Sequence, residues 1–249
     1  MWDDARQLNA TALGLALVAF VALGAGMVVW LVRQPAFDFR EVVVTDAPAR
    51  VNTAQLEAVI RDELAGTFFT MNLDRAREAL SRVPWVRRVA LRREWPQRLL
   101  VTIEEHEPYA RWNADALVNP QGEIFVADFD GDLPKLDGAD TRAAELAARL
   151  RDWTAALAPL GLALREIHVS PRGGWRLRVA GPSGAIDLEL GRDEPGDRLA
   201  RFLAVYGRTV GVLARTGTRV DRVDLRYRNG FAAHVPGFRE RPVKKTGNA

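Results

Sequence analysis

Apolar side chains dominate one uninterrupted stretch near the start of the chain, Thr11–Val32, which contains no charged residue. A helix rises about 1.5 Å per residue, so this stretch reaches roughly 33 Å, the thickness of a bilayer's hydrocarbon core. A cleaved signal peptide has a shorter apolar region, roughly 7–15 residues long, and here Met27–Val32 continues the run past the small residues Gly24–Gly26. The pattern predicts a retained transmembrane helix over residues 11–32, behind a short polar cytoplasmic tail over residues 1–10.

Shorter alternating segments follow over residues 34–112 and predict a compact unit of the order strand, helix, helix, strand, strand. Leu99, Val101 and Ile103 alternate with polar residues, so they share one face of the last strand and are expected to form core. The predicted elements are a strand over Phe37–Thr45, helices that begin after Asn52 or Thr53 and after Asn72, and strands over Arg87–Glu94 and Arg98–Glu105.

The pattern over residues 113–238 predicts a second domain, a mixed α/β unit with an antiparallel-rich sheet, so the fold class of the whole chain is α+β. The expected elements are a hairpin over Asp115–Val126, a loop over Leu133–Gly138, a long helix capped by Asp140, strands over Leu164–Ser170, Trp175–Ala180 and Ile186–Leu190, a helix from Pro195 to about Ala214, and a final hairpin of Val220–Tyr227 with Phe231–Val235. Residues 239–249 are basic and lack periodicity, which predicts a disordered tail.

Composition and motif spacing offer no catalytic, cofactor or metal site. The chain has no cysteine, which excludes a disulfide framework and cysteine-ligated zinc. Its net charge of only +3 does not by itself imply a nucleic-acid partner. His106, His168 and His234 lack the spacing of metal ligands. The acidic run Asp128–Asp132 resembles the start of a calcium loop, but Ala139 stands where the bidentate glutamate is needed. We therefore expect a protein that is not an enzyme and takes no cofactor or small-molecule substrate.

Four arginines crowd one predicted strand, at positions 87, 88, 92 and 93. The simplest interpretation is a solvated sheet face, on which Glu94, Glu104 and Glu105 pair with arginines across strands. An anionic partner or a lipid head-group surface is the alternative. Nucleic acid is not expected, because aromatic residues flank these strands instead of interleaving with the arginines.

The final hairpin carries the most informative predicted geometry. Asn229-Gly230 is a strong signal for a two-residue type I′ turn, which would pair Arg228 with Phe231. That register places Val223, Leu225, Tyr227, Ala232 and His234 on one face, and Asp224, Arg226, Arg228, Phe231, Ala233 and Val235 on the other. The last strand has no Lys, Glu or internal Pro to block pairing with another chain, so it is a candidate docking edge.

Several segments together resemble the FtsQ/DivIB family of bacterial division proteins. They are FFTMNL (Phe68–Leu73), VPWVRRVALRREWPQRLLVTIEEHEPYARW (Val83–Trp112), LVNPQGEIF (Leu117–Phe125), GWRLRV (Gly174–Val179) and VDLRYRNG (Val223–Gly230). The resemblance covers nearly the whole chain in the family's order. It implies a POTRA domain over residues 34–112, directly after a single membrane anchor, and a C-terminal β domain over residues 113–238.

The resemblance also implies a role and a binding site. The family's members are divisome scaffolds of the cell inner membrane at the septum, with the C-terminal bulk in the periplasm. Their last hairpin receives a strand from the partner FtsB, and FtsL, FtsW/FtsI and FtsK are further implied partners. By motif match, the residues carried onto this chain are Arg226, Tyr227, Asn229 and Gly230. Four residues of the last strand, Phe231, Ala232, Ala233 and Val235, are further partner-binding candidates, and Arg172 is a candidate for pairing with an acidic residue of the partner.

This sequence departs from the family pattern at two of these positions. Phe231 replaces a small residue after the glycine, and Val235 stands where some members carry an aromatic residue. Two other functions stay open at this point. One is a POTRA-bearing component of polypeptide transport or outer-membrane assembly, and the other is a membrane-anchored envelope hydrolase, which the absence of convergent catalytic residues disfavours.

Overall fold

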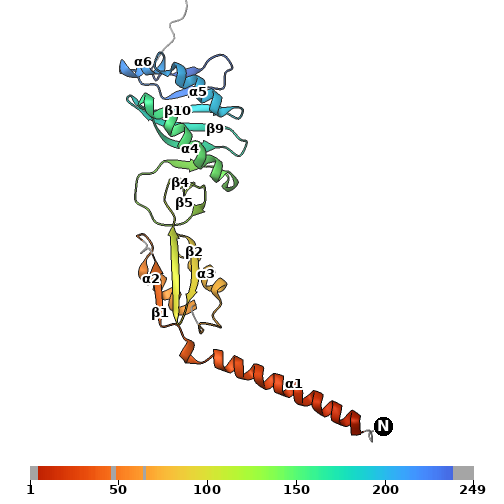
Figure 1. The fold of residues 1–249 in the computed structure, drawn as a ribbon. Helices are drawn as coiled ribbons and strands as arrows, with labels where there is room; N and C mark the ends of the chain where they lie inside the picture. Colours follow the sequence, from red (N-terminus) through yellow and green to blue (C-terminus); the bar gives the residue numbers. More distant parts are fainter. Residues whose placement is uncertain (1–4, 46–48, 64–65, 238–249) are drawn as a thin grey trace, which may run out of the picture. The chain divides into compact units, whose positions relative to one another are not determined.

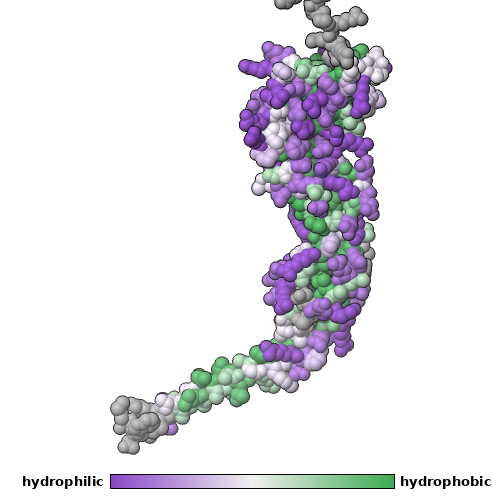
Figure 2. Space-filling view, turned by 180° about the vertical axis from the view of Figure 1, so that it is seen from behind, coloured by the Kyte–Doolittle hydropathy of each residue, from purple (hydrophilic) through white to green (hydrophobic). Residues whose placement is uncertain are grey.

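The computed structural model describes residues 5–45, 49–63 and 66–237, and the chain divides into two compact units, Met1–His106 and Glu107–Ala249 (Figure 1). The first unit begins with a long helix, α1 (Ala5–Val32), whose segment Asn9–Val32 is long and apolar enough to cross a membrane. Figure 2 shows its surface as largely hydrophobic. The helix therefore takes in part of the predicted polar tail, while the predicted disordered segment 239–249 lies outside the described residues.

The rest of the first unit has the predicted order of strand, helix, helix, strand, strand. Its elements are a 3₁₀ turn η1 (Pro35–Phe37), β1 (Glu41–Thr45), α2 (Thr53–Glu63), α3 (Leu73–Ser81), β2 (Val86–Glu94) and β3 (Arg98–Glu105). The first strand is shorter than predicted, because Phe37 belongs to the 3₁₀ turn and pairing with β3 begins only at Glu41. Asn72 caps α3 by accepting hydrogen bonds from the amides of Asp74 and Arg75, at 3.0 and 3.1 Å.

A three-stranded sheet of order β1-β3-β2 organises this unit, with β3 parallel to β1 and antiparallel to β2. As predicted, Leu99, Val101 and Ile103 of β3 are buried on one face. Leu56 of α2 and Leu80 of α3 pack into the same core. Alternation along the central strand therefore creates the apolar face, and the two helices cover it.

The boundary between the units lies earlier than the predicted position after Trp112. Residues Ala110–Trp112 form a strand, β4, which pairs with β5 (Ala116–Val118) and β7 (Lys135–Asp137) of the second unit. Trp112 is buried in the second core, and its indole N–H donates to Asp140 at 2.8 Å. These backbone and side-chain bonds assign residues 107–112 to the second unit.

The second unit contains a mixed nine-stranded sheet of order β12-β11-β10-β9-β8-β7-β4-β5-β6. Its further elements are β6 (Ile124–Phe125), η2 (Asp140–Arg142), α4 (Ala143–Leu157), η3 (Ala158–Leu160), β8 (Ala163–Val169), β9 (Trp175–Gly181), β10 (Gly184–Gly191), α5 (Pro195–Tyr206), α6 (Val210–Arg215), β11 (Arg222–Asp224) and β12 (Ala232–His234). The α+β class that we predicted is thereby confirmed.

One face of this sheet is core and the other is polar. Along β9, Leu177 and Val179 are fully buried, while Arg176 and Arg178 between them are exposed. Helices α4 and α5 contribute buried side chains to the same core, and both lie against the sheet in Figure 1. The opposite face carries cross-strand ion pairs, such as Arg178–Asp187 at 3.1 Å.

Three predicted features of this unit are wrong in detail. The expected loop over Leu133–Gly138 contains β7, which pairs in parallel with both β4 and β8. Asp140 does not cap α4, because its carboxylate accepts the Trp112 indole bond. The expected helix from Pro195 divides into α5 and α6, and Thr209 between them bonds its hydroxyl to the carbonyl of Val205 at 2.9 Å.

We predict that Val101→Ala lowers the free energy of unfolding of the first unit by about 1–3 kcal/mol, because it leaves a cavity in a closed core. Thr102→Ala is the matched control on the same strand. Its side chain points to the other face, so a change below about 0.5 kcal/mol is expected. Denaturant unfolding of the full chain measures both, and equal effects of the two substitutions would refute this core.

Candidate partner-binding surface

The last strand, β12, lies at the end of the nine-stranded sheet, as the sequence predicted. All three of its residues are exposed. It pairs antiparallel with β11 through Arg222–His234, Val223–Ala233 and Asp224–Ala232. Its other edge has no strand beside it among the described residues.

The predicted hairpin register is wrong by three residues. The predicted register pairs Asp224 with Val235, whereas in the structure Asp224 pairs with Ala232. No two-residue type I′ turn forms, since neither Asn229 nor Gly230 has the positive φ that such a turn requires. Residues 225–231 instead form a longer connection between the strands.

An odd register shift exchanges the two faces of a strand. Ala233 therefore shares a face with buried Val223, and Ala232 shares the opposite face with Asp224. The cause is Phe231, whose ring packs edge-on against Phe202 of α5 with centroids 5.5 Å apart. The predicted register would have placed this phenylalanine on the charged face of the sheet.

Backbone bonding identifies the group that β12 presents at its open edge. The carbonyl of His234 accepts a hydrogen bond from the amide of Asp221 at 3.3 Å, so it points toward β11. In an antiparallel ladder the N–H and C=O of one residue point the same way, and neighbouring residues point opposite ways. The N–H and C=O of Ala233 therefore point away from β11, toward the open edge.

Two side-chain pairs hold this strand and its connection. His234 Nδ1 lies 2.7 Å from a carboxylate oxygen of Asp221, and this hydrogen bond lowers the pKa of Asp221 below its ordinary value of 3.8. The Arg226 guanidinium donates to both carboxylate oxygens of Asp224, at 2.9 and 2.6 Å, which lowers the pKa of Asp224 and raises that of Arg226. The first pair therefore links β12 to the residue before β11, and the second links the end of β11 to the connection that follows it.

A basic depression of about 610 Å³ brings together two of the predicted residues, Arg172 and Arg226. Five arginines line it against two carboxylates, so its local charge is positive. Gly191 allows the close approach of its neighbours, because a Cβ there would lie 2.6 Å from an Arg198 nitrogen. Arg172 makes no ion pair with any residue in the described part of the chain. The lining is His168, Ser170, Arg172, Gly174, Trp175, Arg176, Glu189, Gly191, Arg192, Asp193, Arg198 and Arg226.

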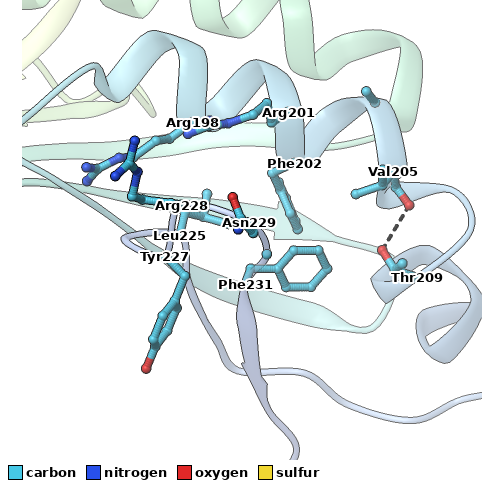
Figure 3. Close-up of a pocket in the computed structure, with 12 residues that line it drawn as sticks. Arg198, Arg201, Phe202, Val205, Thr209, Leu225, Tyr227, Arg228, Asn229 and Phe231 are labelled. Atoms are coloured by element: carbon cyan, nitrogen blue, oxygen red, sulfur yellow. Dashed lines mark hydrogen bonds between the residues drawn. The ribbon is translucent and has the colours of Figure 1, made fainter.

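A second hollow, of about 620 Å³, lies between α5 and the connection that precedes β12. Figure 3 shows Phe231 beside Phe202 on its wall, while Tyr227 points away from the helix. The Tyr227 side chain is 58% exposed. Of the predicted candidates, Tyr227, Asn229, Gly230 and Phe231 line this hollow. Val235 follows β12 and is partly buried against the core.

Sequence reasoning missed the contribution of α5 to this surface. Arg198 lines both hollows, and Phe202 packs against Phe231, but neither residue was among the predicted partner-binding candidates. The missed signal was the unexplained Phe231, an apolar residue directly after Gly230, which needs an apolar partner from elsewhere in the fold.

The arginines of β2 are largely engaged within their own unit. Arg87 pairs with Glu104 across the strands, as predicted, and Arg98 of β3 pairs with Glu41 at 2.7 Å. Arg93 donates to the carbonyl of Met71 at 2.6 Å. Within the described ranges, no group of three or more His, Asp or Glu side chains is arranged to hold a metal ion.

Comparison with known proteins agrees with this architecture. The family model "POTRA domain, FtsQ-type" matches residues 37–106, and "Cell division protein FtsQ/DivIB, C-terminal" matches residues 110–226. A cell division protein FtsQ from Burkholderia pseudomallei is 37% identical, covering 96% of each chain. One from Nitrosospira multiformis is 36% identical over 94% of this chain and 98% of its own, and one from Bordetella pertussis is 32% identical over 98% and 100%. The chain belongs to the FtsQ/DivIB family of cell division proteins.

Proposed function

We propose that this chain is a non-enzymatic scaffold of the division machinery that links early and late division proteins at the septum by binding partner chains. Membership of the family supports a role in the divisome. The partners proposed from the resemblance are FtsB, FtsL, FtsW/FtsI and FtsK. The surface of the second unit supports binding, because it combines a sheet edge without a neighbouring strand among residues 107–237 with a basic depression.

The open edge of β12 is the observation that carries the proposal. The N–H and C=O of Ala233 face outward, so an extended segment of FtsB can add to the sheet as a tenth strand through backbone bonds. The side chains of Ala232 and Ala233 are small and exposed, and so they leave room for the incoming chain. Backbone pairing of this kind needs no catalytic group.

The flanking hollows would give this pairing its direction and specificity. The basic depression lined by Arg172 and Arg226 suits acidic side chains of the partner. Exposed Tyr227 offers a rigid aromatic contact beside the strand. An acidic and apolar segment is therefore the kind of chain that this surface fits.

We further propose that α1 spans the inner membrane once, with residues 34–249 in the periplasm. The length and hydropathy of the helix support a single-pass anchor, and the family supports the orientation. A periplasm-dependent reporter fused after residue 249 should be active in cells. Activity of a cytoplasm-dependent reporter at the same place would reverse the orientation.

Proline substitutions in β12 test the strand addition. We predict that Ala233→Pro weakens binding of the periplasmic segment of FtsB by at least about 1.4 kcal/mol, tenfold in Kd, because it removes the outward N–H. Titration calorimetry with the full chain in nanodiscs measures the loss. Ala233→Val, which keeps the N–H, is the matched control and should bind almost as the parent does.

Ala232→Pro distinguishes loss of the hairpin's own backbone bond from loss of the outward N–H that would bind a partner. Its N–H faces β11, so this proline should weaken the hairpin itself and lower the melting temperature of the second unit more than Ala233→Pro does. Parent-like affinity of a folded Ala233→Pro variant would sink the strand-addition model.

Charge reversal tests the basic depression. We predict that Arg172→Glu lowers the association rate of the FtsB segment, and that the difference from the parent shrinks as salt is raised, since exposed charges are screened. Arg151→Glu on α4 is the control, because it reverses a similarly exposed arginine outside the depression. Surface plasmon resonance at several ionic strengths gives the rates, and equal behaviour of the two variants would exclude Arg172 from the interface.

A further inference from the structure

Four phenylalanines form a cluster in the first unit. Phe37 and Phe69 meet edge-to-face with ring centroids 5.2 Å apart, and Phe68 and Phe69 meet at 5.3 Å. Phe39 contacts Phe68 at 5.8 Å. The cluster joins the segment after α1 to the loop before α3. Phe69 is nevertheless 52% exposed, so the cluster is only partly buried by its own contacts.

Short covalent and hydrogen-bond links hold this cluster close to the end of the anchor. Phe37 follows Val32 by five residues, which span at most about 18 Å when fully extended. The hydroxyl of Thr67 donates to the carbonyl of Val32 at 2.6 Å, and the amide of Phe68 donates to the carbonyl of Phe37 at 2.7 Å. The loop that carries Phe69 is therefore attached to the last turn of α1.

The turn between β2 and β3 belongs to the same end of the unit. The Gln97 side chain donates to the carbonyl of Ala36, and the Gln97 carbonyl accepts from the amide of Arg40 at 3.0 Å. Trp95 in this turn is 79% exposed. In the described part of the first unit outside α1, the exposed large apolar residues are Val42, Phe69 and Trp95. Exposed apolar surface of this unit thus gathers where the anchor leaves the bilayer.

We propose that this end of the unit, with Phe69 and Trp95 at its surface, is a membrane-interface surface that contacts the lipid head-group region of the leaflet from which α1 emerges. Aromatic side chains favour that region, because a flat apolar ring fits between head groups and the indole N–H can bond there. Trp30 in the last turns of α1 is 63% exposed and suits the same depth. The contact would tie the first unit to the membrane at a second point beyond the anchor itself.

Charge does not carry this contact. Arg33 and Arg40 are exposed near the cluster, but Asp38 is also exposed there, and Arg98 is paired with Glu41 at 2.7 Å. Aromatic insertion should therefore proceed on zwitterionic as well as on anionic lipid. The inference rests on α1 spanning the bilayer and is independent of strand addition at β12, so either proposal can fail without the other.

The absence of cysteine makes a depth measurement straightforward. Single substitutions Trp95→Cys and Arg88→Cys in the full chain take an environment-sensitive fluorophore, and the labelled chain is placed in phosphatidylcholine nanodiscs that contain a head-group-proximal doxyl lipid. The two positions are seven residues apart, roughly 23 Å along an extended chain. We expect a large loss of fluorescence at position 95 and almost none at position 88, with the same loss at 95 when phosphatidylglycerol is added.

Phe69→Cys, labelled in the same way, gives a second reading from the other loop. Thermal unfolding of each labelled chain verifies that the unit is folded. Quenching at 95 and at 69 above the value at 88 supports the membrane contact. Equal quenching at 88 and 95 would overturn it. The proposal would also be overturned if the doxyl lipid did not quench the label at position 95 but an added FtsB segment changed its fluorescence, because that turn would then bind protein.

Discussion

The packing of Phe231 against Phe202 is the contact on which the architecture of the binding surface depends. It joins the last strand to α5, with ring centroids 5.5 Å apart, and so determines the face on which Phe231 lies. Because side chains alternate along a strand, fixing that one ring also fixes its neighbours. Ala233 then presents its N–H and C=O to the open edge, and Ala232 pairs with Asp224. One apolar contact thereby determines which backbone groups the short strand presents at its open edge.

This contact also explains which parts of the fold were predictable. Alternation along β3 identified Leu99 and Val101 as core, because apolar and polar residues alternate in a strand that is buried on one face. The last strand was predicted as an edge for a different reason, because it contains no Lys, Glu or internal Pro that would block pairing. The hairpin register was not predictable from the Asn229-Gly230 dipeptide. Phe231 packs against Phe202, 29 positions earlier in the chain, and this contact outweighs the local turn preference.

The sequence indicated some residues of the candidate surface but not their arrangement. Arg226 was a candidate by motif match and Arg172 by its charge, and only the fold brings them into one depression around Gly191. Arg198 and Phe202 carried no signal of their own, since a helical apolar pattern does not reveal what lies beyond the core it covers. The short strand β7 was missed for a related reason: three residues are too few to establish a period.

The two units have different physical tasks under this account. The first combines an apolar helix with a small domain whose exposed aromatic residues gather beside the end of that helix. The second offers a sheet edge that has no strand beside it in the described part of the chain, and a basic depression lined in part by β8, β9 and β10. Neither membrane anchoring nor strand pairing requires a buried ionisable group, and both are compatible with the proposed scaffold role.

Backbone amide exchange at Ala233 tests the central claim most directly. It can be followed by NMR on the full chain in nanodiscs, with and without a saturating amount of the periplasmic segment of FtsB. The account predicts that the amide of Ala233 exchanges fast in the free chain and becomes strongly protected in the complex, while the amide of Ala232 is already protected in the free chain by its bond to β11. Unchanged exchange at Ala233 in a saturated complex would contradict strand addition at this edge.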